Sequence, residues 1–331
     1  MAKIVTLGEI MLRLSTAQGM RIFQSDQFSA QYGGAEANVA ISLANFGHEV
    51  AFASKVPQHA LGDAVEKHLA TFGVDTTLLL RGGQRLGTYY VETGVGQRAS
   101  KVTYDRFGSS FATMDITEWE TDELFKDVTI FHITGITPAL SKLWQTQLNV
   151  LIQAAKQAGA KVSFDMNYRG NLWSQQEASE VLQTILPYVD YCSAGELDAR
   201  YLLNIATQDS LADYYESIHQ LFPNIKVFYS TKREVYSASE NELMGTIWTE
   251  ATGYLESKPH KITAIVDRVG GGDAFSAGVL HGILQEMPYQ EVIEFATAAS
   301  VLKHTVYGDC NVFSQADVEQ FLTSATGAIS R

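Results

Sequence analysis

The sequence predicts an α/β fold in which a doubly wound, mainly parallel sheet is covered by helices on both faces and carries a small β-sheet lid. Three observations support this prediction. Strand-like runs alternate with amphipathic stretches along most of the 331 residues, hydrophobic residues make up 46% of the chain, and two segments interrupt the alternation. Such a chain can build one large core, so we expect a single domain over residues 1–331.

The alternation starts at the first residues and implies right-handed βαβ units. The expected strand and helix pairs are 3–7 with 35–46, 49–54 with 63–72, 129–134 with 143–158, and 161–165 with 176–185. Further strands are expected at 188–193, 226–230 and 261–266, with a hairpin over 234–248 and helices over most of the last sixty residues.

The two interrupting segments, about 11–32 and 86–111, predict the lid. In the second segment Tyr89, Val91 and other large residues alternate with polar or small neighbours, as in strands with one covered face. We expect the two segments to pair into a separate small sheet over the edge of the main sheet.

Composition excludes several functional classes. A net charge of −13 argues against a general nucleic-acid or membrane-surface binder. No run approaches the eighteen apolar residues of a membrane span, and Met1 leads into a strand-like run without a signal peptide. We therefore expect a cytoplasmic protein that acts on a small molecule.

The most informative motif is the glycine-rich segment 267–277, Asp-Arg-Val-Gly-Gly-Gly-Asp-Ala-Phe-Ser-Ala. Apolar residues recur at helical spacing after it, which predicts that Gly270, Gly271 and Gly272 stand at a helix start. Backbone amides there lack partners and attract an anion, here a transferring phosphoryl group. Asp273 suits either an N-cap or a base that deprotonates an attacking hydroxyl, and the segment alone does not decide.

Polar residues elsewhere suit a polyol or an acid. Asn38 follows Gly34 in the first turn of a predicted helix and offers both a donor and an acceptor, although a Gly-Gly pair is also compatible with a plain flexible cap. Arg169 lies beyond a strand's carboxyl end, where parallel sheets bind ligands, and Arg106 ends a lid strand. Each arginine is either a solvated surface charge or a partner for a carboxylate.

Two motifs point away from other nucleotide-binding folds. The segment 94–99 matches the dinucleotide fingerprint but lies between strand-like runs, so we interpret it as a hairpin turn. The sequence has no Gly-Lys pair and therefore no Walker P-loop.

With these motifs together, the sequence resembles the carbohydrate kinases of the ribokinase or PfkB family over nearly its whole length. Gly33-Gly34 with Asn38 and Gly47 resembles the N-terminal signature, and residues 267–273 resemble the C-terminal signature that carries the anion hole and the catalytic base. The resemblance implies a ribokinase-like fold, ATP as phosphoryl donor and Mg²⁺ as cofactor. It leaves the need for a monovalent cation open.

Within the family the sequence is most similar to kinases of 2-keto-3-deoxygluconate. This resemblance implies that Asp273 is the base and that Gly270, Gly271 and Gly272 stabilise the phosphoryl group. It implies sugar-acid contacts at Gly34, Asn38, Tyr90, Tyr104, Arg106, Arg169, Asp273 and Asp309. It implies ATP contacts at Asn167, Arg169, Ser230, Thr231, Lys232, Gly270 and Gly272.

The chain departs from the family pattern at several positions. Glu36 stands where ribokinases have a small residue, and Arg268 replaces the usual threonine after Asp267. The motif that influences magnesium reads Gly-Glu-Leu-Asp at 195–198, so either Glu196 or Asp198 takes over that role. The nucleotide loop reads Ser-Thr-Lys-Arg-Glu over 230–234 in place of the usual glycine pattern.

The resemblance therefore implies phosphorylation of 2-keto-3-deoxygluconate at its primary (6-) hydroxyl, with 2-keto-3-deoxy-6-phosphogluconate and ADP as products. It also implies a homo-oligomer, a dimer through the lid or larger. Two alternatives stay open: a kinase of a neutral sugar such as fructose or ribose, and a sugar- or nucleotide-binding regulator of the same fold without turnover.

Overall fold

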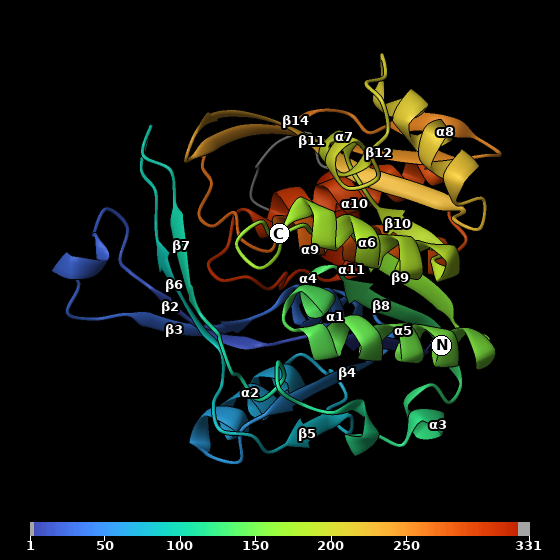
Figure 1. Ribbon diagram of the computed structural model, residues 1–331. Coiled ribbons are helices and arrows are strands. Elements are labelled where there is room, and N and C mark those ends of the chain that lie inside the picture. The colour runs from blue at the N-terminus through green and yellow to red at the C-terminus, as the bar shows by residue number, and fades with distance from the viewer. Residues whose placement is uncertain (1–2, 324–331) are drawn as a thin grey trace.

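The computed structural model describes residues 3–323, which form one large sheet covered by helices and one small sheet beside it (Figure 1). Residues 1–2 and 324–331 of the predicted domain lie outside the described part. The strands are β1 (Lys3–Leu7), β2 (Met11–Ser15), β3 (Ser29–Gly33), β4 (Glu49–Val56), β5 (Leu79–Arg81), β6 (Thr88–Glu92), β7 (Lys101–Asp105), β8 (Val128–Thr134), β9 (Lys161–Asp165), β10 (Tyr191–Ser193), β11 (Val227–Ser237), β12 (Glu240–Thr249), β13 (Gly253–Glu256) and β14 (His260–Ile262). The helices are α1 (Ala35–Asn45), α2 (Ala60–Thr71), α3 (Thr121–Leu124), α4 (Ile136–Ala139), α5 (Lys142–Gln157), α6 (Gln175–Ile185), α7 (Glu196–Tyr201), α8 (Leu211–Leu221), α9 (Gly271–Leu284), α10 (Tyr289–Lys303) and α11 (Gln315–Thr323).

The large sheet has the strand order β13-β12-β11-β10-β9-β8-β1-β4-β5, with β14 paired to β12. Neighbours from β11 to β5 run parallel, whereas β12 is antiparallel to β11, β13 and β14. Parallel neighbours need crossover connections, which the helices supply. The prediction of a doubly wound, mainly parallel sheet is confirmed.

Helices cover both faces of this sheet. Buried side chains of α1, α2, α9 and α10 pack on one face, and those of α5, α6 and α8 pack on the other. The helix α5 shows why the sequence folds this way. Ser141 caps it by accepting from the Trp144 amide, and Leu148, Leu151 and Ile152 recur at helical spacing and are fully buried or nearly so.

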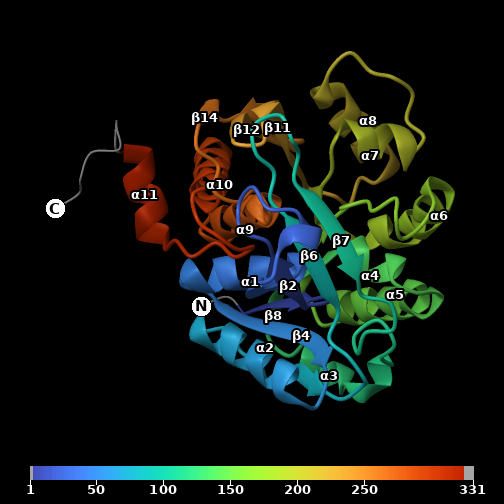
Figure 2. The same cartoon turned by 90° about the vertical axis from the view of Figure 1, so that its left-hand side faces the viewer.

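The lid is a four-stranded sheet with the order β3-β2-β6-β7. Its two central strands, β2 and β6, pair in parallel, and each carries an antiparallel neighbour. The segments 11–32 and 86–111, far apart in the sequence, therefore meet in one sheet, as the lid prediction required. The lid projects from the side of the main body, and Figure 2 shows it facing the viewer.

Residues 94–98 form the turn between β6 and β7, where Val95 and Arg98 exchange two backbone hydrogen bonds of 2.9 and 3.0 Å. This confirms the interpretation of the fingerprint-like segment as a hairpin turn. The turn also touches the main body, because the Ala238 amide donates to the Gly96 carbonyl at 2.8 Å.

Three predicted strands were wrong in extent. The strand predicted over 188–193 is β10 and begins only at Tyr191, because Leu186–Tyr188 form a short 3-10 helix. The predicted strand over 261–266 is only the short β14, because Ile265 and Val266 instead donate single hydrogen bonds to Ser239 and His304. The run 226–230 and the predicted hairpin are continuous, since β11 and β12 pair over their length. Within residues 3–323, no helix has the length and apolar composition needed to cross a membrane.

Candidate active site

A cavity of about 620 Å³ lies where the lid meets the main sheet, the start of α1 and the start of α9. Most of the residues predicted for the site border it. Those that do are Gly34, Asn38, Tyr104, Arg106, Asn167, Arg169, Asp198, Gly270, Gly272, Asp273 and Asp309. The cavity therefore brings together residues from positions 34 to 309 of the chain.

The three glycines at the start of α9, the N-cap Gly270 and the first helical residues Gly271 and Gly272, have three different structural roles. Gly270 has a φ of +81°, and a Cβ there would lie 1.8 Å from the Asp309 carbonyl oxygen, so only glycine fits. A Cβ on Gly271 would lie 2.5 Å from Cε1 of His304. Apart from its chain neighbours and its own helical turn, a Cβ on Gly272 would meet no atom of residues 3–323 within 4 Å, and this residue borders the cavity. Gly272 therefore leaves room for a ligand, whereas Gly271 is required by packing.

Asp273 does not cap α9. The N-cap is Gly270, and Asp273 lies in the first turn, where its Oδ2 accepts a hydrogen bond of 2.7 Å from Nδ2 of Asn38. Burial raises the pKa of the carboxyl to about 6, although the bond from Asn38 opposes the shift. A carboxylate with this pKa is largely ionised at pH 7 and can still accept a proton, which is what a general base requires.

Two further carboxyl groups lie close to Asp273. Burial, followed by repulsion from Asp273, raises the pKa of Asp165 to about 7. Burial also raises the pKa of Glu36 to about 7, even though Oγ1 of Thr134 donates to it at 2.7 Å. The cavity floor therefore carries several acids that repel one another, and an ionised Asp273 needs nearby positive charge or amide dipoles.

Arg106, predicted as the partner of a substrate carboxylate, already has a partner in the chain. Its Nε donates to Oε2 of Glu9 at 2.7 Å, and the two side chains are 10% and 2% exposed. The other Glu9 oxygen, Oε1, is buried without a hydrogen-bond partner among the described residues. A bound carboxylate would therefore have to share the Arg106 guanidinium with Glu9.

The tyrosine of β6 that borders the cavity, beside Tyr104 of β7, is Tyr89 and not the predicted Tyr90. Side chains alternate along β6, so the two tyrosines point to opposite faces of the lid. Tyr89 is 3% exposed and stacks on Tyr104 with ring centroids 5.7 Å apart, whereas Tyr90 packs edge-on against Phe28. Val91, an apolar residue two positions after Tyr89 and therefore on the same face, was the sequence signal for which tyrosine faces inward.

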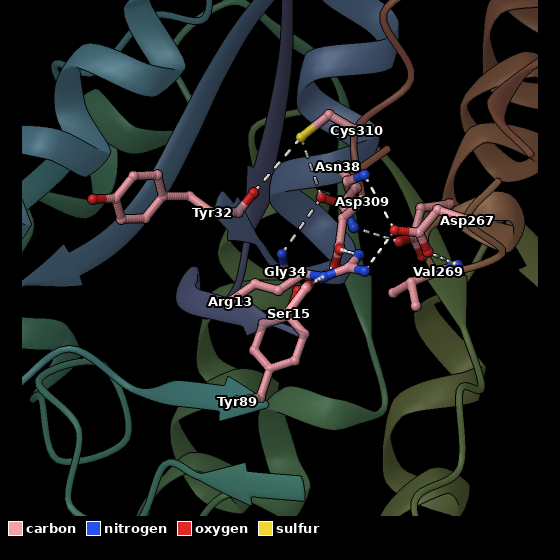
Figure 3. A network of polar contacts seen from close by, with 12 residues as sticks. Arg13, Ser15, Tyr32, Gly34, Asn38, Tyr89, Asp267, Val269, Asp309 and Cys310 are labelled. Carbon is pink, nitrogen blue, oxygen red and sulfur yellow. Dashed lines mark hydrogen bonds and ion pairs between the residues drawn. The ribbon is translucent and has the colours of Figure 1, made fainter. Parts of the chain in front are cut away.

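A buried network that was not predicted from the sequence ties the lid to residues 267–272, the glycine turn at the start of α9 (Figure 3). Arg13 of β2 is 2% exposed and donates to Ser15 at 2.8 Å, to Asp309 at 2.5 Å and to Asp267 at 2.5 Å. The Tyr89 hydroxyl donates to the other oxygen of Asp309 at 2.5 Å. Burial alone would lower the pKa of Arg13, but Asp309 and Asp267 raise it above its usual value. An arginine inside the apolar run of β2 was the available sequence signal.

This network changes the expected role of Asp309. One of its carboxylate oxygens accepts from Arg13 and the other from Tyr89, so its contact with a sugar hydroxyl would be an additional bond on an already ordered group. Removing one partner from a buried ion pair of this kind is strongly destabilising, by about 3–5 kcal/mol. Asp309 is therefore rigidly positioned at the cavity wall.

The residues expected in a nucleotide loop lie in β11 and do not border the cavity. Ser230 bonds to the Tyr215 hydroxyl at 2.8 Å, Thr231 pairs with Gly245 in the strand ladder, and Lys232 donates to Glu256 at 2.6 Å. The prediction of a loop at these positions was wrong, because β11 continues through them to Ser237.

The two candidate carboxylates for magnesium differ in position. Asp198 borders the cavity and accepts from the Gly195 amide at 2.8 Å, and burial raises its pKa. Glu196 is half exposed and pairs with Arg200 at 3.2 Å. Among residues 3–323 no three histidine, cysteine or acidic side chains are grouped to hold a metal ion by themselves.

Comparison with known proteins gives a consistent result. The chain matches the pfkB family carbohydrate kinase profile over residues 1–316. A 2-dehydro-3-deoxygalactonokinase from Haloferax volcanii is 32% identical over 330 residues, which cover 100% of this chain and 99% of the relative. The crystal structure of a PfkB family carbohydrate kinase from Listeria grayi has a TM-score of 0.95 at 45% identity and covers 97% of this chain and 100% of that one. The structure of 2-dehydro-3-deoxygluconokinase from Thermotoga maritima has a TM-score of 0.94 at 39% identity and covers 98% and 100% of the two chains.

Proposed function

Because the chain belongs to the pfkB family of carbohydrate kinases, we propose that it phosphorylates 2-keto-3-deoxygluconate at the primary (6-) hydroxyl, with ATP as donor. The products would be 2-keto-3-deoxy-6-phosphogluconate and ADP. Two relatives named for 2-dehydro-3-deoxy sugar acids, each matched over nearly its whole length, support a sugar acid as substrate.

The observation that carries this proposal is Asp273, a partly buried carboxyl of pKa about 6 in the first turn of α9 beside the cavity. In the proposed reaction Asp273 takes the proton of the primary hydroxyl as its oxygen attacks the γ-phosphorus. The bond from that phosphorus to the bridging oxygen breaks and ADP leaves. Amides of Gly270 and Gly272 would stabilise the developing charge directly at the cavity wall, and Gly271, whose amide already donates to the Arg268 carbonyl at 3.3 Å, would contribute through the positive end of α9.

Sugar binding is proposed at the lid side of the cavity. Asn38 and Gly34 would hold hydroxyls, Asp309 would accept from another, and Tyr104 and Arg106 would meet the keto-acid end. The Arg106 guanidinium lies 5.7 Å from the centre of the Tyr104 ring, which keeps both groups at the same wall. Arg169 and Asn167 would lie toward the phosphates of ATP.

Asp198 fits the expected magnesium better than Glu196 does, because its partly buried carboxyl borders the cavity. Oxygen ligands and retained waters are what Mg²⁺ prefers, so we propose that Asp198 acts on the ion through water. When bound, the ion neutralises phosphate charge during transfer. Glu196 remains with Arg200.

An ATP-consumption assay over a panel of acids and sugars tests the proposal. The panel should contain 2-keto-3-deoxygluconate, its galactonate epimer, fructose and ribose, since the Haloferax volcanii relative is named for the galactonate. We expect the acids to be phosphorylated in preference to the neutral sugars. If none of the four compounds is phosphorylated, the result would favour the non-catalytic regulator.

A neutral-sugar kinase remains the second candidate, favoured by one observation: Glu9 already neutralises Arg106. Arg106→Ala separates the two candidates. If Arg106 binds the substrate carboxylate, we expect the change to lower kcat/KM for the acid by roughly 10–150-fold, the effect of losing one charge-assisted bond. Steady-state kinetics with the acid and a neutral analogue measure it.

The control for Arg106→Ala is the double variant Glu9→Gln/Arg106→Ala, because the single change leaves Glu9 buried without its partner. The double variant should fold normally, and its kcat/KM should still fall more for the acid than for the neutral analogue. Equal losses for acid and neutral substrates would show that Arg106 acts on the lid or on ATP.

We propose that the chain forms a dimer through the lid. All five residues of the edge strand β7 are exposed, and Val102 and Tyr104 are among them. Light scattering on the intact chain should give a dimer or larger species. Thr103→Lys, on this edge and away from the cavity, should shift the mass toward the monomer, and an unchanged mass would place the interface elsewhere.

A further inference from the structure

Three arginines differ from all the others within residues 3–323. Every other described arginine has a carboxylate oxygen within 4 Å of its guanidinium. Arg169, Arg233 and Arg268 have no such partner in the described part of the chain. None of the three is a fully solvated surface residue, because each is only partly exposed. In a chain with a net charge of −13, three partly buried cations without acids suggest an external anion.

All three arginines lie around the glycine turn. Arg169 borders the main cavity. Arg268 belongs to the turn itself, where the Gly271 amide donates to its carbonyl at 3.3 Å. Arg233 lies on β11 two positions beyond Thr231 and four beyond Tyr229, and therefore shares their face.

That face of β11 is the one covered by α9. The Tyr229 ring packs against Phe275 of α9 with centroids 6.1 Å apart. Arg233 is therefore the cation of β11 on the face toward α9. Lys232 lies on the opposite face and is paired with Glu256.

The charged groups described around Arg233 do not neutralise its positive charge. Burial, and then the charge of Arg268, lowers the pKa of Arg233 to about 10. His304 lies beside Gly271, and burial and then Arg233 lower the pKa of its imidazole to about 4, so it is neutral. The ammonium of Lys303 adds another buried positive group, bonded to the Asp267 carbonyl at 3.1 Å. Like charges held together in this way are stabilised by an anion between them.

We infer that Arg233 and Arg268, together with Arg169, form a clamp for the triphosphate of ATP around the glycine turn. The inference rests on the proposed function in one respect, that ATP is the phosphoryl donor. Guanidinium groups suit this task because their planar donors match phosphate oxygens in pairs. The clamp also supplies phosphate contacts in a chain whose 230–234 segment is a strand without glycine.

Isothermal calorimetry with ATP, ADP, AMP and inorganic tripolyphosphate on the unaltered chain, Arg233→Gln and Arg268→Gln tests the inference. We expect each variant to bind ATP, ADP and tripolyphosphate roughly 10–100-fold more weakly, the loss of one charge-assisted bond. AMP, which lacks the outer phosphates, should change much less. Arg81→Gln is the matched control, because it removes the same charge from a pair with Asp63 and Glu66 and should leave all four affinities unchanged.

Unchanged ATP and tripolyphosphate affinities in folded variants would overturn the inference, as would equal losses for AMP and ATP. If a glutamine variant does not fold, the lysine variant at that position keeps the charge but loses the planar fork. Its ATP affinity should still fall more than its AMP affinity, and parallel changes would again overturn the inference.

The clamp and the proposed function fail in distinguishable ways. An unaltered chain that binds ATP through these arginines but phosphorylates no panel member would contradict the proposed function and leave the clamp standing. A chain that phosphorylates the sugar acid, with variants that keep full ATP affinity, would contradict only the clamp.

Discussion

Asp273→Asn should remove most turnover while leaving the fold intact. Loss of a general base lowers kcat by roughly 10²–10⁴-fold. The fold should survive because Gly270 and not Asp273 is the N-cap, and because an asparagine oxygen can still accept the bond from Asn38. Thermal unfolding and steady-state kinetics with the preferred sugar acid measure the two effects.

The pH profile gives an independent measure of the same residue. Because the Asp273 pKa is about 6, the base is protonated below this pH and free above it. We expect kcat/KM to rise with pH up to about 6 and then to level off. The rise should be absent from the residual activity of Asp273→Asn.

Asp213→Asn is a suitable control for this substitution. Asp213 also lies in the first turn of a helix, α8, and does not border the cavity, so kcat should stay unchanged. A folded Asp273→Asn variant with near-normal kcat would instead show that Asp273 is structural, and the catalytic assignment would fail.

Gly272→Ala should lower kcat by about 10²-fold, the effect expected when a reacting group is displaced by about 1 Å. Outside its own helical turn, the added Cβ meets no atom of the described residues within 4 Å, and it enters space at the cavity wall, where the transferring phosphoryl group is proposed to lie. Stability should change little, and sugar binding should suffer less than phosphoryl transfer.

Gly271→Ala is the matched comparison, because its Cβ would lie 2.5 Å from the His304 ring. This variant should lose stability through packing strain, by about 1–3 kcal/mol. Kinetics and thermal unfolding of both variants test whether Gly272 serves phosphoryl transfer while Gly271 serves stability. If Gly272→Ala keeps its kcat, or if both variants lose only stability, the glycines are structural and do not form an anion site.

The order of strands and helices could be predicted because it depends on local patterns. β1 and β9 occupy the predicted residues, and α1, α5 and α6 differ from prediction by one residue at an end or at both ends. The failures came where hydrogen bonds to distant residues decide the structure. Residues 263–266 look like a strand, but Val266 donates to His304 at the end of α10 and not to a neighbouring strand.

The candidate site divides in the same way. Most of its predicted residues do border one cavity, because strand ends and helix starts gather at one edge of a parallel sheet. The strand face on which a side chain lies, and the residue with which it pairs, were less predictable. Tyr90 was named instead of Tyr89 because a shift of one residue in a strand reverses its side-chain direction. Lys232 was predicted to contact ATP, whereas Arg233 is the basic residue of β11 that lies on the face toward α9.

By itself, the sequence determined the fold class, the helix start at the glycine turn and the family, because periodicity, glycine conformation and motif spacing are properties of short segments. Only the tertiary structure decided which charges are paired. Arg13 meets Asp267 and Asp309, and Arg106 meets Glu9, across separations of 97 to 296 positions. Pairing depends on distances of a few ångströms after folding, since charge interactions strengthen as burial removes water, and no local pattern records those distances.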